Sequence, residues 1–233
     1  MVAAAKVDGT GLIRVEHPVM ETYTGKLVAF QDPKPEQIDI LDIAHQLGML
    51  CRYTGACIKR YSVAEHCCRV HDAYLNQAGY GGGFYDVTAE VPDDVAETAL
   101  GLLMHDAHEA YTNDLSRPFL ALLGVAEAVL PAQERLQTAI HEKFEMFVPD
   151  PAVLKALDNG VLKAEAEDNM LSCGAAWDLD AVEAADVPLE YWSPERAKAE
   201  FLCRFAMWRP LSKTAVAELV WQLRQDSDIA EAL

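Results

Sequence analysis

The sequence has no apolar run near the ~18 residues that a membrane span needs, and its first residues lack the apolar stretch of a secretory signal. Basic residues are also scarce: 19 Lys and Arg stand against 37 Asp and Glu, a formal net charge of −18. A protein that coats nucleic acid needs clustered Lys and Arg, so we expect no nucleic-acid polymer and no membrane as partner. A small anionic substrate stays compatible with this charge, because a bound metal reverses the sign locally.

Cysteine patterning excludes two further classes of protein. Of the six cysteines none stands in a CxxC pair, and Cys67 and Cys68 are adjacent. The sequence therefore predicts neither a zinc ribbon nor a disulfide framework. Reduced cysteines and a cytoplasmic location are expected. A phosphate-binding loop of the Walker type and internal repeats are absent as well.

Long strand patterns are missing, and helical periodicity dominates. The 233 residues are 51% hydrophobic and 24% charged, as in an ordinary globular domain. Only residues 11–15 and 26–30 are typical of short strands. We predict one all-α domain in three parts: a short β-like N-terminal arm (1–35), a helical core (36–180) and a helical C-terminal extension (181–233). The apolar face of the extension could cap the core or form an interface.

Helix boundaries follow from capping residues and apolar spacing. Asp39 is a candidate N-cap for a helix with Ile40 and Ile43 on one face, and Ser62 with Glu65 fits a capping box for a helix to about residue 76. A loop is predicted over 78–92. Further helices are expected at 93–111, 120–148 with an interruption at Pro131, 151–173, 195–208 and 213–225.

The residues that carry chemistry are histidines and carboxylates within the predicted helices. They are His66, the doublet His105-Asp106, Glu109 one turn later, Asp114 after that helix, and Asp168 far downstream. Two imidazoles and two carboxylates suit a divalent metal ion: Mn, Co, Zn, Ni, Fe or Mg. Spacing alone leaves a second interpretation open, in which His105 packs at a helix end and Asp106 is solvated.

Several ordered motifs resemble one known family. Residues 103–118, LMHDAHEAYTNDLSRP, resemble the core motif of the HD superfamily of metal-dependent phosphohydrolases. The similarity is specific to the branch of bacterial 5′-deoxynucleotidases and phage dATP triphosphohydrolases. Residues 42–47, 51–53 and 61–66 upstream and 163–179 downstream are also similar to that branch, so the resemblance spans residues 25–180.

The resemblance implies an HD-domain helical bundle and a set of site residues. It implies that His66, His105, Asp106 and Asp168 bind the metal, with Glu165 and Glu167 as alternatives to Asp168. It implies that Glu109 and Asp114 orient or activate the attacking water. In substrate binding, Arg52 matches a phosphate-contacting Arg, since guanidinium pairs bidentately with phosphate. Close relatives often carry a Lys where Phe119 stands here, and Lys59, Arg60 and Arg117 are candidates to replace it.

The expected function is hydrolysis of a small nucleotide, most simply a 2′-deoxyribonucleotide, in the cytoplasm of a bacterium or a phage-infected cell. Both a dNTP triphosphohydrolase, such as a dATPase, and a dNMP 5′-nucleotidase fit, because their metal ligands are the same. The alternatives are a nucleotide-sensing HD protein with little turnover and a phosphodiesterase for cyclic nucleotides or dinucleotides. A homo-oligomer is expected from the relatives.

Overall fold

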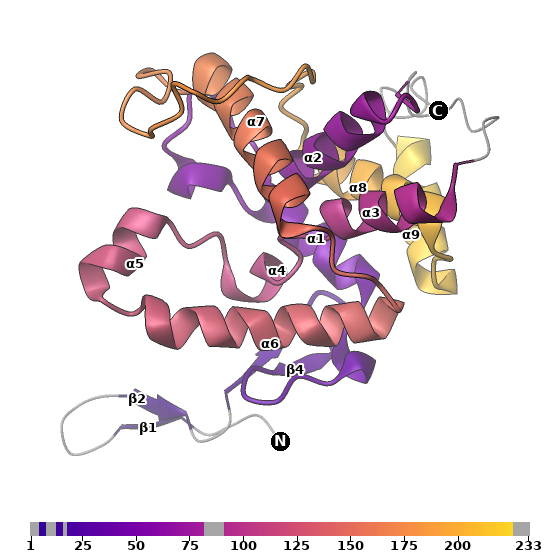
Figure 1. Ribbon diagram of the computed structural model, residues 1–233. Coiled ribbons are helices and arrows are strands. Elements are labelled where there is room, and N and C mark those ends of the chain that lie inside the picture. The colour runs from indigo at the N-terminus through magenta and orange to yellow at the C-terminus, as the bar shows by residue number, and fades with distance from the viewer. Residues whose placement is uncertain (1–4, 8–12, 16–17, 82–90, 226–233) are drawn as a thin grey trace.

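The computed structural model describes residues 5–7, 13–15, 18–81 and 91–225, and most of these residues are α-helical (Figure 1). The prediction of a mostly helical chain is therefore confirmed. Most of the predicted loop 78–92 and the end of the C-terminal extension lie outside the described residues. No helix in the described part of the chain is both long and apolar enough to cross a membrane.

The N-terminal arm consists of two short antiparallel hairpins. Strand β1 (Ala5–Val7) pairs with β2 (Ile13–Val15), and β3 (Val19–Glu21) pairs with β4 (Leu27–Ala29). In the second hairpin Val19 lies opposite Ala29. The two predicted strands overlap β2 and β4, whereas β1 and β3 were not predicted.

The helices follow the predicted order with several changes of boundary. They are α1 (Ile40–Met49), α2 (Val63–Gln77), α3 (Asp93–Leu103), α4 (Glu109–Thr112), α5 (Arg117–Leu123), α6 (Ala126–Phe144), α7 (Pro151–Asn169), α8 (Pro194–Trp208) and α9 (Lys213–Gln225).

Both predicted N-caps are confirmed. The Asp39 side chain accepts a hydrogen bond from the amide of Leu41, and the Ser62 side chain accepts one from the amide of Glu65. The Glu65 side chain, however, does not complete a capping box. Its buried carboxylate accepts hydrogen bonds from the backbone amides of residues 190–192, at 2.8 Å, 3.0 Å and 2.8 Å.

Several predicted helix boundaries were wrong. The segment expected over 120–148 forms two helices, α5 and α6, and the helix expected over 151–173 ends at Asn169. Two further differences have a local cause. The helix expected over 93–111 ends at Leu103, because the His105 ring takes the carbonyl of Leu102 that would otherwise continue the helical ladder. Conversely, α6 continues through Pro131. This proline deprives only the carbonyl of Glu127 of a helical partner, and Glu127 is exposed to water at the helix start.

The core gathers side chains from distant helices. Ile43 of α1, Leu103 of α3, Ile140 of α6 and Phe201 and Phe205 of α8 are all fully or almost fully buried in one cluster. Helix α8 packs against α1, α2 and α3. The apolar face of α8 in the C-terminal extension thus covers the core, and α2 is held between α8, α3 and α7.

Candidate metal centre

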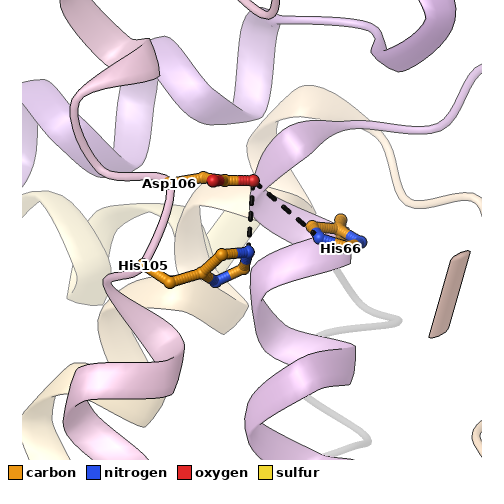
Figure 2. A group of neighbouring side chains, drawn as sticks. All are labelled: His66, His105 and Asp106. Atoms are coloured by element: carbon orange, nitrogen blue, oxygen red, sulfur yellow. Dashed lines mark ion pairs between the residues drawn. The ribbon is translucent and has the colours of Figure 1, made fainter. Parts of the chain in front are cut away.

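Three of the predicted metal ligands converge. His66 comes from the first turn of α2, and His105 and Asp106 come from the turn that joins α3 to α4 (Figure 2). The Oδ2 atom of Asp106 lies 3.1 Å from Nε2 of His105 and 3.9 Å from Nε2 of His66. One ligand atom from each residue lies within 4.8 Å of the other two, so the three could hold one ion.

The far side of each imidazole is fixed by a second contact. Nδ1 of His66 lies 2.7 Å from Oε1 of Glu165, and Nδ1 of His105 lies 2.8 Å from the carbonyl of Leu102. An oxygen at Nδ1 selects the tautomer that leaves the Nε2 lone pair free. Both Nε2 atoms are buried, and each lies 3.1 Å from a carboxylate oxygen, of Asp158 for His66 and of Asp106 for His105. Two buried imidazole nitrogens that face two carboxylates fit a cation with nitrogen and oxygen ligands.

Asp158 of α7, and not Asp168, lies beside these histidines. Oδ1 of Asp158 is 3.1 Å from Nε2 of His66, a distance that brings a second carboxylate to the edge of the cluster. Burial alone would raise the pKa of Asp158, but the hydrogen bond and charge of His66 and the charge of His105 lower it to about 2.

The structure places Asp168 elsewhere. Its side chain is exposed and accepts a hydrogen bond from Tyr191, whose ring centroid lies 4.2 Å from Nζ of Lys59. The reason is helical geometry: ten residues separate Asp158 from Asp168, which is about 15 Å along the axis and about 80° around it. Seven residues bring Glu165 back to within about 20° of Asp158, on the face toward His66. The structure therefore does not bring Asp168 to these histidines, and the carboxylate of α7 that lies beside them is that of Asp158.

Arg52 lies at the edge of the cluster. This buried guanidinium donates from Nε to Oε2 of Glu165 at 3.2 Å, and its Nη1 lies 3.9 Å from Oδ2 of Asp106. Burial is the largest single effect and opposes its charge, but Glu165, Tyr53, Asp114 and Asp106 together outweigh burial and hold the pKa of Arg52 well above its ordinary value. Tyr53 also donates a hydrogen bond to Glu165. Arg52 and Tyr53 thus fix the carboxylate that orients His66.

The backbone after Arg52 is strained. Tyr53 and Thr54 have φ angles of 57° and 55°, and Gly55 follows with 78°. Side chains with a Cβ rarely adopt this left-handed conformation, and three such residues in succession are unusual. The strained turn presents Arg52 and Tyr53 together to Glu165.

Glu109 and Asp114 lie near the same cluster. Ligand atoms of Glu109, His108 and Asp106 form a second group within 4.8 Å of one another. Burial raises the pKa of Glu109 to about 9, helped by repulsion from the carboxylates of Asp106 and Asp114. Without a cation, Glu109 is therefore protonated at neutral pH, and it is placed to exchange a proton next to Asp106.

The ion pair of His105 and Asp106 dominates the local charge. Burial alone would lower the pKa of His105, but Asp106 outweighs it and raises this pKa to about 9. Burial would likewise raise the pKa of Asp106, but His105 and His66 hold it well below its ordinary value. Without metal, the site thus holds a protonated His105 paired with the carboxylate of Asp106. A divalent cation would displace the proton of His105.

Two of the remaining substrate-binding candidates lie on the surface of the protein. Lys59 is exposed beside Tyr191, and Arg117 is exposed at the start of α5. Neither forms an ion pair with the cluster among the residues that the structure describes. Their assignment to a substrate phosphate stays a prediction.

Sequence reasoning missed two residues of this centre, Asp158 as a ligand candidate and Glu165 as the partner of His66. A seven-residue spacing puts two side chains on one face of a helix, so the pair 158 and 165 could have been recognised as a single inward face of α7. The motif at residues 163–179 instead favoured Asp168 and left Glu165 and Glu167 as alternative metal ligands.

Comparison with known proteins gives relatives without an assigned role. No family model matches the chain. It is 29% identical over 201 residues to the uncharacterized protein YfdR of Escherichia coli K12, across 84% of this chain and 98% of that protein. It is 31% identical over 150 residues to the uncharacterized protein RCAP_rcc00048 of Rhodobacter capsulatus, across 62% of this chain and 69% of that protein. With this identity and coverage, the chain belongs to the same protein family as RCAP_rcc00048.

Proposed function

We propose that this protein is a metal-dependent phosphohydrolase of the HD type that acts on nucleotides, most simply 2′-deoxyribonucleotides. One observation carries the proposal: the buried Nε2 atoms of two histidines converge on the carboxylates of Asp106 and Asp158. A helical chain that brings a His-Asp doublet onto a histidine of another helix supports the HD assignment made from the motif.

Four side chains would hold the cation: His66, His105, Asp106 and Asp158. Two imidazoles and two carboxylates suit Mn, Fe, Co, Ni or Zn, and Mg less well. Such an ion, when bound, polarises a phosphoryl group and lowers the pKa of water.

The protein's own groups around the ligands have separate tasks. Glu165 and the carbonyl of Leu102 hold the two imidazoles in the tautomer and orientation that a ligand needs. The guanidinium of Arg52, next to Asp106, would contact a substrate phosphate through paired N–H groups. Glu109 would hold and return the proton that the nucleophile or the leaving oxygen exchanges, with Asp114 close enough to influence its charge.

The nucleotide class rests on the motif at residues 103–118, because the ligand set is common to many phosphate esters. The net charge of −18 disfavours long nucleic-acid substrates and leaves small nucleotides. The same ligands serve a monophosphate and a triphosphate substrate, so the products distinguish a 5′-nucleotidase from a triphosphohydrolase.

The test is a product analysis with Mn²⁺ or Co²⁺ and a panel of dNMPs, dNTPs and NTPs. We expect deoxynucleoside with either orthophosphate or intact tripolyphosphate, and no product from Asp106→Ala. Asp168→Asn is the matched control, since it removes a nearby carboxylate outside the cluster and should keep the activity.

Absence of turnover on every nucleotide, with metal shown to be bound, would refute hydrolysis and favour a sensing protein. Cleavage of cyclic nucleotides alone would instead make the protein a phosphodiesterase.

A further inference from the structure

Two of the six cysteines lie against each other next to the candidate metal centre. Sγ of Cys51 is 3.7 Å from Sγ of Cys57, and both residues are partly exposed as free thiols. In contrast, Cys67 and Cys68 are buried, and Cys173 is exposed. The described residues therefore hold one thiol pair that combines closeness with access to solvent.

The backbone holds this pair in place from two sides. Cys51 forms an isolated β-bridge with Ser62, and the amide of Arg52 donates to the carbonyl of Tyr61 at 2.8 Å. On the other side, the amide of Ile58 donates to the carbonyl of Asn169 at 2.9 Å. Bond formation between the two sulfurs needs an S–S distance of about 2.05 Å, an approach of roughly 1.7 Å, which side-chain rotation and a small loop movement can supply.

The chain between the two cysteines carries functional contacts. It contains Arg52, whose guanidinium lies between Glu165 and Asp106, and Tyr53, which donates to Glu165. It also contains the three successive left-handed residues from Tyr53 to Gly55. A crosslink across this strained turn would restrict the segment from which Arg52 reaches the cluster.

We propose that Cys51 and Cys57 form a reversible disulfide that restrains the Arg52 loop and weakens substrate binding. The oxidant is a small-molecule disulfide such as oxidised glutathione. The thiolate of one cysteine attacks a sulfur of the reagent and expels one thiol. The second cysteine then attacks the mixed disulfide and expels the other. The protein loses two electrons and two protons, and the reagent leaves as two thiols.

The crosslink itself is tested on the full chain, without reference to activity. Reduced protein is equilibrated with mixtures of oxidised and reduced glutathione, alkylated, unfolded and cleaved after Arg52. We expect the peptides that carry Cys51 and Cys57 to be recovered as one linked species, lighter by two hydrogens than the sum of the free peptides. Cys203→Ser, another partly exposed cysteine, should leave this species unchanged, whereas Cys57→Ser should abolish it. Free thiols at both positions, under conditions that already modify Cys173, would overturn the proposal.

The effect on binding rests on the proposed function and has its own readout. Oxidation should raise KM roughly tenfold, the effect of weakening one charge-assisted contact to phosphate, and a dithiol reductant should restore it. Cys57→Ser should keep the reduced KM under both conditions. A linked protein with an unchanged KM would overturn the restraint on Arg52. If the reduced protein hydrolyses no nucleotide, the proposed function fails, and the peptide analysis still decides whether the disulfide forms.

Discussion

Two variants on α7, Asp158→Asn and Asp168→Asn, distinguish a metal centre that includes Asp158 from the one that the motif implied, which includes Asp168. Asp158 lies 3.1 Å from His66, whereas Asp168 is exposed and bonded to Tyr191. Asp158→Asn keeps the shape of the side chain and removes its charge. Two opposite charges about 4 Å apart at a protein surface interact by about 4 kcal/mol, part of which is offset by relief of repulsion from Asp106. We expect metal binding to weaken about 100-fold, or about 2.7 kcal/mol.

The loss of metal affinity also predicts a smaller effect of the metal on the melting temperature Tm. A metal concentration of about 100 times Kd stabilises the wild type by about 2.7 kcal/mol, which for a domain of this size raises Tm by roughly 5–10 °C. The same concentration is only about equal to Kd for Asp158→Asn, so Tm should rise by only about 1–2 °C. Asp168→Asn should respond like the wild type.

Titration calorimetry with Mn²⁺ and melting curves with and without metal measure both effects. A Tm response that Asp168→Asn loses and Asp158→Asn keeps would refute the geometric assignment of the fourth ligand. A response that neither variant loses would show that α7 contributes no ligand.

Three further predictions concern stability. Glu65→Ala removes a buried carboxylate that accepts from three backbone amides and should cost about 3–5 kcal/mol in urea unfolding, with a smaller loss for Glu65→Gln. Asp72 accepts two hydrogen bonds from Arg204 at 2.8 Å, which lower its pKa although burial opposes this. The stabilisation is therefore complete above the ordinary carboxyl pKa of about 3.9 and is lost as pH falls toward the lowered value. The stability gap between wild type and Asp72→Asn should accordingly shrink from pH 7 to pH 3, and a gap that grows on acidification would contradict this. In Gly48→Ala the new Cβ would lie 2.9 Å from the carbonyl oxygen of Pro194, so thermal unfolding should reveal a loss of about 1–3 kcal/mol.

The helical character of the chain was predictable because it depends on local rules. The caps at Asp39 and Ser62 stand where the sequence placed them, since a short polar side chain before an apolar repeat satisfies the first free amides of a helix. The break after Leu103 was not predictable in the same way. It depends on the His105 ring taking a backbone carbonyl, and apolar spacing continues through that break.

Two parts of the candidate site differ in how well the sequence predicted them. His105 and Asp106 are neighbours in the chain, and His66 follows a capped helix start, so all three fall within short motifs that the resemblance to the HD family selected. The spacing of Asp158 and Glu165 puts them on one face of α7, but that this face packs against α2 becomes known only from the structure. A carboxylate-rich helix offers several candidates, and tertiary packing decides which of them is buried.

The buried carboxylate of Glu65 has a consequence for the order of folding. Glu65 directly precedes His66 in α2, and its hydrogen-bond partners at residues 190–192 come from far later in the chain. Contacts of such long sequence separation form slowly, because the intervening chain must be ordered first. During synthesis, α2 emerges long before residues 190–192, whose amides donate to this carboxylate, exist. We therefore expect the hydrogen bonds at the start of α2, next to His66, to be completed only after the C-terminal segment has docked.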